Sequence, residues 1–409
     1  MMLKKWGVLL LLIGLTLLFG LMLTYPDSSW KAAVRGLAIW WDVLFPSLFP
    51  FFVISEMMLG FGIVHFLGML LDPLMKPLFR IPGSGGFVAA MSLASGYPVS
   101  AKLTSKLREQ QLITREEGER LVAFTTTSDP IFLIGAVSVG FFHNPQLAGT
   151  LAAAHYGSSL LVGLLMRFHE PGAAPTPTAP GTRAGFSLRP ALKAMHEARM
   201  GDDRSFGEQL RQAVISALQL MTVVGGLVVV FSVLLEVLSA SGLMTQLYEL
   251  IRQVLSLLHL PSALAEPLVG GGFEVTLGAK ASAAVPASVP LAFKAAAAAF
   301  ILSWAGLSVH AQIASILSGT GMRYFPFLLS RIIHAVLAAL LVLILWPLTG
   351  PDTEVFLSFG DPLLSKPGWS GLPSAGLLML QVLSLLLILS FFIHLIQRLW
   401  NKPKASKWK

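Results

Sequence analysis

Hydrophobic positions fill this chain in long runs that short polar stretches interrupt. Ten of these runs are about as long as the 20 or so apolar residues that a transmembrane helix needs. They lie near residues 6–24, 36–55, 62–79, 121–141, 147–167, 212–236, 242–259, 291–317, 325–348 and 372–397. The pattern predicts an all-α, polytopic membrane protein. The first run is too long for the apolar core of a secretory signal, so we interpret it as a retained helix.

Two further apolar segments, near 83–101 and 262–281, are interrupted by glycines and polar residues. Both end in Ala-Lys, at Lys102 and Lys280, which are 178 positions apart. A similar offset of 179 relates His155 to His334. Duplicated, interrupted segments are typical of transporter binding sites, because unwound backbone inside the membrane can coordinate a solute.

Charge predicts which ends of these segments face the cytoplasm, where Lys and Arg concentrate. The rule places both termini, the 102–120 segment and the 169–208 loop in the cytoplasm, and the acidic 350–371 loop outside. One net crossing by each interrupted segment satisfies every placement and gives twelve crossings. Re-entrant hairpins are the alternative that the sequence leaves open. The two halves are then inverted repeats of about five helices each, with discontinuous segments and one extra helix at each terminus.

The predicted organisation has six parts, which follow from these runs and loops. They are an N-terminal transmembrane helix (1–30), a first repeat (31–168), a Pro/Ala-rich linker (169–208), a second repeat (209–349), an extracytoplasmic loop (350–371), and a C-terminal helix with a basic tail (372–409). Within the linker, we interpret residues 191–204 as a solvated connector rather than an amphipathic helix.

Composition also indicates a membrane protein and limits the kinds of functional site that the chain could contain. Hydrophobic residues make up 55% of the chain and charged residues 12%, against about a quarter charged in soluble domains. The net charge of +8 sits largely beside apolar spans, so we expect no nucleic-acid partner. The chain has no cysteine and carries no phosphate-binding loop, zinc motif or nucleophile elbow. We therefore expect neither an enzyme nor a protein with a cofactor or metal.

Polar residues inside apolar spans carry the functional hypotheses, since each is costly there without a partner or water. Glu274 follows three glycines and precedes Thr276, so its carboxylate is a candidate for binding a proton, a cation or the substrate. Asp129 is a second ion-coupling candidate beside Pro130, and Thr127, Ser128 and Thr276 are candidate substrate-binding residues. For both acids, the structural alternatives are a hydrogen-bonded helix tie and a simple proline kink.

The remaining candidates flank the same interrupted segments and the helix near 291–317. In the first half they are Ser95, Tyr97, Ser100 and Lys102; in the second they are Lys280, Ser303, Trp304, Ser308, His310 and Gln312. The two lysines would suit an anionic solute if they point inward, and would otherwise extend to the lipid headgroups. His155 and His334 are interpreted as structural.

Three ordered motifs resemble a known family. Leu44-Phe-Pro-Ser-Leu-Phe-Pro-Phe-Phe52, Ser95-Gly-Tyr-Pro-Val-Ser-Ala-Lys102 and Ser303-Trp-Ala-Gly-Leu-Ser-Val-His-Ala-Gln312 look like the YlbJ-type sporulation integral membrane proteins, which carry the Gate nucleoside-recognition domain. The resemblance covers about residues 30–350. The chain departs from it at Ser128-Asp129-Pro130, where the family usually has Ser-Gly-Pro.

The resemblance implies a transporter of endospore formation in the mother-cell-derived outer forespore membrane, with dipicolinic acid as its substrate. Tyr97 or Trp304 would then stack on the aromatic ring. Proton or sodium coupling and a homo-oligomer are left open. The alternatives are an ion-coupled nucleoside permease and a non-transporting sporulation scaffold. A scaffold should tolerate changes at Glu274 and Ser303 together.

Overall fold

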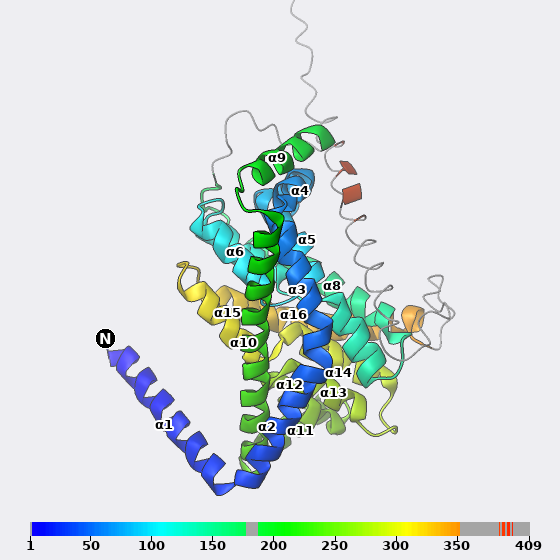
Figure 1. Ribbon diagram of the computed structural model, residues 1–409. Coiled ribbons are helices and arrows are strands. Elements are labelled where there is room, and N and C mark those ends of the chain that lie inside the picture. Colours follow the sequence, from blue (N-terminus) through cyan, green and yellow to red (C-terminus); the bar gives the residue numbers. More distant parts are fainter. Residues whose placement is uncertain are drawn as a thin grey trace, which may run out of the picture.

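The computed structural model describes residues 2–176 and 187–351, with a few separate residues between 384 and 395 (Figure 1). Every regular element in these residues is helical, which confirms the predicted all-α class. Most of the predicted C-terminal helix, the 350–371 loop beyond its first two residues and part of the predicted linker lie outside the described residues.

The first half of the described chain contains ten helical elements. They are α1 (Met2–Thr24), α2 (Pro26–Ile39), η1 (Trp40–Leu44), α3 (Phe45–Gly60), α4 (Ile63–Phe79), α5 (Ser84–Ser95), α6 (Val99–Glu109), α7 (Arg115–Thr125), η2 (Ile131–Phe141) and α8 (Leu147–Met166). The rest are α9 (Leu188–Met200), α10 (Phe206–Ala240), α11 (Leu243–Leu257), η3 (Ser262–Leu264), α12 (Ala265–Phe273), α13 (Val275–Ala284), α14 (Leu291–Trp304), α15 (Gly306–Ser318) and α16 (Tyr324–Thr349).

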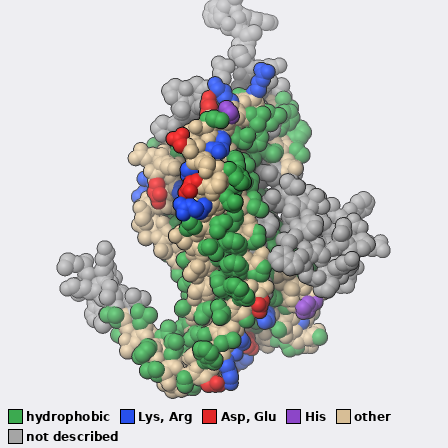
Figure 2. Space-filling model, in the orientation of Figure 1, with side chains coloured by type: hydrophobic (Ala, Val, Ile, Leu, Met, Phe, Trp, Pro, Cys, Tyr) green, Lys and Arg blue, Asp and Glu red, His purple; other side chains and the backbone are tan. Residues whose placement is uncertain are grey.

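Four helical runs in the described residues are long and apolar enough to cross a membrane by themselves. They are α8, α10, the run Leu291–Ser318 and α16, and the bent pair formed by α1 and the following helix counts as a fifth if taken as one span. Figure 2 shows apolar side chains over the middle of the molecule and charged ones gathered nearer its two ends. This distribution suits a protein surrounded by lipid.

The bundle has two ends, which we name after residues that lie there. At the Glu119 end, α7 meets the turn before α16 through hydrogen bonds between Glu119 and Arg323. At the opposite, Thr150 end, the start of α8 meets the end of α16, where the Thr150 hydroxyl donates to the Thr349 carbonyl at 2.5 Å. The long helix α10 connects the two ends, from α4 and α9 to α2 and α11 (Figure 1).

The first interrupted segment is a re-entrant hairpin that opens at the Glu119 end. It begins just after Arg80, whose carbonyl accepts a hydrogen bond from Arg120 of α7 at 3.0 Å. It ends with α6, which a short connection joins to Thr114 at the start of the same α7. Because both ends of the hairpin lie beside α7's first turns, α5 and α6 enter and leave on the same side.

The second interrupted segment is a hairpin that opens at the Thr150 end. Leu264 before it and Val285 after it share one apolar cluster with Leu255 of α11. A Cβ on Gly278 would lie only 2.2 Å from the Cα of Gly271, so α12 and α13 pack back to back. The two hairpins therefore open at opposite ends, as inverted repeats require.

Each repeat crosses the bundle three times, which corrects the sequence-based count of five. In the first repeat α3, the pair α7–η2 and α8 cross, and in the second α10, the pair α14–α15 and α16 cross. The predicted crossing near 62–79 is α4, which instead lies beside α9 at the Glu119 end (Figure 1). Its counterpart α11 lies at the Thr150 end. Most of the predicted connector at 191–204 is helical, because α9 extends to Met200; Ala191 is buried and the other side chains of α9 are exposed or half-buried.

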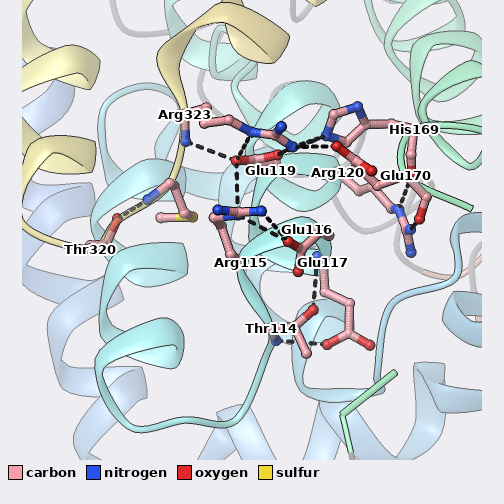
Figure 3. Close-up of polar contacts among 11 residues, drawn as sticks. Thr114, Arg115, Glu116, Glu117, Glu119, Arg120, His169, Glu170, Thr320 and Arg323 are labelled. Carbon is pink, nitrogen blue, oxygen red and sulfur yellow. Dashed lines mark hydrogen bonds and ion pairs between the residues drawn. The ribbon is translucent and has the colours of Figure 1, made fainter. Parts of the chain in front are cut away.

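A polar cluster fastens the Glu119 end (Figure 3). The side chain of Glu119 is fully buried and accepts hydrogen bonds from the backbone N–H, Nε and NH2 of Arg323 at 2.8 to 3.0 Å. His169 Nε2 lies 2.7 Å from the same carboxylate, and Arg323 also pairs with Glu170 at 3.0 Å. Hydrogen bonds to Glu119, and then to Glu170, raise the pKa of Arg323 above its usual value. The cluster thus joins α7, the end of α8 and the α15–α16 turn.

Replacing Arg323 with glutamine should destabilise the protein, because it leaves Glu119 buried without its main cation. Removing one partner of such a pair typically costs about 3 kcal/mol or more. Thermal unfolding in detergent measures the effect. Arg115→Gln is the matched control, since Arg115 is equally exposed but lies 3.9 Å from Glu119 and pairs mainly with Glu116. Equal losses for both variants would contradict this role of Arg323.

Candidate functional site

Four helix interruptions meet near the middle of the bundle, two from each repeat. In the first repeat they are the hairpin tip at Gly96 and the break between α7 and η2. In the second they are the hairpin tip at Glu274 and the break at Ala305 between α14 and α15. The sequence indicated three of these, and the break at Ala305 lies inside a run that hydropathy presents as one helix.

The break between α7 and η2 follows from the Asp-Pro pair. The pyrrolidine ring of Pro130 cannot continue a preceding helix, but it suits the first turn of a new one. Asp129 caps that new helix, because its Oδ1 accepts from the N–H groups of Ile131 and Phe132 at 3.0 and 2.9 Å. The simple proline kink that the sequence offered as the structural alternative is therefore a complete break, where one half-helix ends and another, capped by Asp129, begins.

Glu274 plays the same part in the second hairpin. It has extended backbone between α12 and α13, and its Oε2 accepts from the N–H of Leu277 at 2.8 Å. A carboxylate at a helix N-terminus is stabilised by the free N–H groups and the helix dipole. Each repeat thus places one carboxylate at the start of a half-helix in the interior.

Glycines let the tips of the two hairpins press against the breaks of the crossing helices. A Cβ on Gly96, which has a φ of +61°, would lie 2.8 Å from the backbone N of Asp129. A Cβ on Gly306, with a φ of +74°, would lie 3.1 Å from the Cα of Glu274. The acid is on the crossing helix in the first repeat and on the hairpin in the second. Each acid faces the glycine of its own repeat.

Arg331 of α16 binds the carbonyl ends of both broken crossing helices. It is fully buried, and its NH1 donates to the carbonyl of Thr126 at 2.5 Å and to that of Ser303 at 3.4 Å, while NH2 donates to the carbonyl of Ala123. The last carbonyls of a helix lack partners within it and carry the negative end of its dipole. One guanidinium therefore satisfies α7 and α14 together.

Two histidines extend this network between the repeats. His155 Nε2 accepts from the N–H of Ser128 at 3.0 Å, and its Nδ1 lies 2.8 Å from Ser303 Oγ. His334 Nε2 lies 2.9 Å from the carbonyl of His155, and its Nδ1 lies 3.0 Å from Arg331. These contacts fit the structural role that the sequence suggested for both residues.

A cavity lies between these breaks and helices α3 and α10; we call it the inner cavity. About 50 Å³ of it is open to the centres of water molecules, enough for a few waters. Its polar lining combines seven predicted candidates from both repeats, and its other walls are apolar. The seven are Tyr97, Ser128, Asp129, Glu274, Thr276, Ser308 and Gln312. The oxygens Ser128 Oγ and Gln312 Oε1 have no hydrogen-bond partner among the described residues.

Six other candidates lie around this cavity without lining it. Ser95 is buried at the end of α5, Ser100 Oγ donates to Thr126 Oγ1 at 3.3 Å, and Ser303 contacts His155 and Arg331. Trp304 Nε1 donates to the carbonyl of Gly272 at 3.0 Å. His310 bridges the carbonyl of Trp304 and the hydroxyl of Tyr324 at 3.0 and 2.6 Å. Thr127 is likewise buried beside Ser128.

The two lysines that ended the interrupted segments are not neighbours. Lys102 lies on α6 and lines a second, smaller cavity. Lys280 lies on α13 with its side chain exposed. Neither lines the inner cavity, whose wall contains no Lys or Arg among the residues that the structure describes.

Sequence reasoning missed two residues that build the site. One is Arg331, and the other is Tyr156, whose hydroxyl donates to the carbonyl of Ser128 at 3.0 Å. A signal for Arg331 was present, because an arginine inside an apolar run three residues before a histidine requires partners in the membrane. Tyr156 gave no comparable signal, since tyrosine is common near membrane helices.

Comparison with known proteins points to one family. The Gate family of nucleoside-recognition domains matches residues 42–154, which include the first hairpin and the α7–η2 break. The chain is 41% identical over 414 aligned residues to the sporulation integral membrane protein YlbJ of Bacillus subtilis, covering 99% of this chain and all of the relative. An uncharacterized protein of Alkalihalophilus pseudofirmus is 26% identical over 33% of this chain and 32% of its own length. No solved structure matches.

Changing Gly278 to alanine should force the second hairpin apart, because the new methyl group would collide with the backbone of Gly271. Overpacking of this kind costs about 1–3 kcal/mol. Gly272→Ala is the control on the same hairpin, since nothing lies within 4 Å of a Cβ at that position. Thermal unfolding in detergent compares the two. A Gly278→Ala protein as stable as the control would refute the tight hairpin.

Changing Arg331 to lysine should destabilise the interior although the charge is kept. A lysine presents one compact ammonium, whereas the planar guanidinium reaches carbonyls of two different helices at once. We expect a loss of about 2 kcal/mol or more from carbonyls left unpaired. The matched control is Arg252→Lys on the exposed side of α11. If both variants unfold at the wild-type temperature, Arg331 does not hold the breaks together.

Proposed function

This chain belongs to the family of the sporulation integral membrane protein YlbJ, and we propose that it is a transporter that moves dipicolinate across the outer forespore membrane. The observation that carries the proposal is the inner cavity, where interruptions from both repeats bring seven polar side chains together in an apolar interior. Unpaired polar groups in such a place each cost about 1–3 kcal/mol. A solute that pairs with Ser128 and Gln312 would recover that cost.

The substrate class comes from the family resemblance, and the cavity sets a condition on it. Dipicolinate is an aromatic dianion, whereas the charged groups of the inner cavity are the carboxylates of Asp129 and Glu274. A dianion can enter only if these charges are neutralised, by protons or by bound cations. We therefore propose that transport is coupled to protons or sodium, with both acids as the coupling sites. Once protonated, they would donate hydrogen bonds to the substrate's carboxylates.

The cavity must widen for this substrate to bind. Room for a few waters is too little for a six-membered ring with two carboxylates, so the surrounding helices have to separate. The hairpin tips are the natural moving parts, because each contacts a break rather than the middle of a continuous helix. Tyr97 lines the cavity from such a tip and is placed to stack on the ring.

A nucleoside is the second candidate, and one observation favours it. A cavity lined by acids, amides and hydroxyls suits a neutral solute, because carboxylates accept hydrogen bonds from sugar hydroxyls without any charge to neutralise. The matching domain family is also described by nucleoside recognition. Both solutes would use the same cavity, but only dipicolinate would need protons or cations to neutralise the two carboxylates.

Uptake into vesicles containing purified protein separates the candidates. We expect dipicolinate to accumulate under an imposed proton or sodium gradient, and a nucleoside to accumulate far less. Faster nucleoside uptake would favour the second candidate. No uptake of either by correctly inserted protein would remove both.

Glu274→Gln should then uncouple transport. The glutamine mimics a permanently protonated acid, so gradient-driven accumulation should fall by about tenfold or more while exchange of substrate across the membrane continues. Glu197→Gln on the exposed face of α9 is the control. Unchanged accumulation in Glu274→Gln would show that this carboxylate does not carry the coupling ion.

A further inference from the structure

A second cavity lies next to the inner cavity along the same two helices; we call it the basic cavity. It is lined by Phe52 and Glu56 of α3, Lys102 and Lys106 of α6, and Ser216 and Ala217 of α10, among others. Phe52 is 5% exposed and lines both cavities. The two spaces are therefore neighbours that share one aromatic wall.

The cavities are stacked along α10. The basic cavity contacts Ser216, Ala217 and Leu220, and the inner cavity contacts Val224, Leu227 and Val228. These positions recur every three or four residues, so they form one stripe on the helix. At about 1.5 Å per residue, Ala217 and Val228 are roughly 16 Å apart. Since α10 begins at the Glu119 end, the basic cavity is the one nearer that end.

The charges of the two cavities are opposite. Lys106 lies 3.9 Å from Glu56, whereas Lys102 forms no ion pair within the described part of the chain. Two lysines and one glutamate give the basic cavity a net positive wall, whereas the described residues that line the inner cavity include two acids and no cation. A positive concave surface raises the local concentration of anions.

We propose that the basic cavity is a binding site for a small carboxylate anion, located on the path between the Glu119 end and the inner cavity. Lys102 supplies an unpaired ammonium. Lys106 can break its ion pair with Glu56 and bind the anion instead. About 20 Å³ of the basic cavity is open to the centres of water molecules, so its walls, like those of the inner cavity, must separate for the anion to bind. Phe52 separates this site from the acids until the helices move. The inference rests on the proposed function for the identity of the anion, dipicolinate, but binding there does not depend on completed transport.

A single cysteine can report on this site, because the chain contains none. Ser216→Cys places a nearly isosteric thiol on the α10 wall and leaves both lysines intact. We expect a negatively charged thiol reagent to modify it faster than a positively charged one. Dipicolinate should slow the modification by about fivefold. The control is Thr245→Cys, exposed on α11 at the opposite end, which should show neither effect.

The lysines are then removed in the same background. Adding Lys102→Gln to Ser216→Cys should lower the ratio of anionic to cationic reagent rates by about fivefold and abolish protection by dipicolinate. Lys193→Gln, on the exposed face of α9, should change neither. The inference is overturned if Ser216→Cys shows no charge preference, or if protection survives the loss of Lys102.

The two proposals fail in different ways. Protection of Ser216→Cys in a protein that transports no dipicolinate would keep the basic cavity and remove the transport substrate. Dipicolinate transport with no protection, and with an unchanged KM in Lys102→Gln, would keep the transporter and remove the basic cavity as a binding site.

Discussion

The contact between Arg331 and the carbonyl ends of α7 and α14 is the constraint on which the interior depends. Breaking a helix inside the membrane leaves carbonyls without partners, and the hydrocarbon core of the bilayer contains no water to hydrogen-bond with them. Here one guanidinium from α16 reaches Ala123, Thr126 and Ser303, which belong to different repeats. The two breaks are thereby held at the same depth. Without that alignment, Asp129 and Glu274 would not line one cavity.

The two repeats place an acid and a glycine in exchanged positions. Where the first hairpin has Gly96, the second has Glu274, 178 positions later. On the crossing helices the exchange is reversed, with Asp129 in the first repeat and Gly306 in the second. A side chain on both partners of a contact would not fit, and two glycines would leave no acid. The exchange therefore preserves close packing and still brings two carboxylates to the centre.

Sequence patterns predicted the all-α class better than the path of the chain between its loops. Each repeat crosses three times instead of five, because α4 and the hairpin both fail to cross. Removing two crossings from a repeat leaves every later loop on the same predicted side of the membrane. The charge rule could therefore not detect the error. Hydropathy could not detect it either, since a hairpin and a crossing have the same apolar composition. What distinguishes them is a tertiary contact, such as that between Gly271 and Gly278. The acids of the site were predictable because a carboxylate in an apolar run is conspicuous, whereas Arg331 was overlooked inside the run at 325–348.

The order of charges along α10 constrains how an anion could travel. From the Glu119 end it would meet lysines first and acids second, with Phe52 between them. Lysines attract an anion but also hold it, so a second step has to favour release. Protonated acids provide that step, since they offer hydrogen bonds without charge, while ionised acids repel the anion. The protonation state of Asp129 and Glu274 would then decide whether the anion advances. Coupling of anion movement to protons would thus follow from the order of charges along α10 and would need no further site.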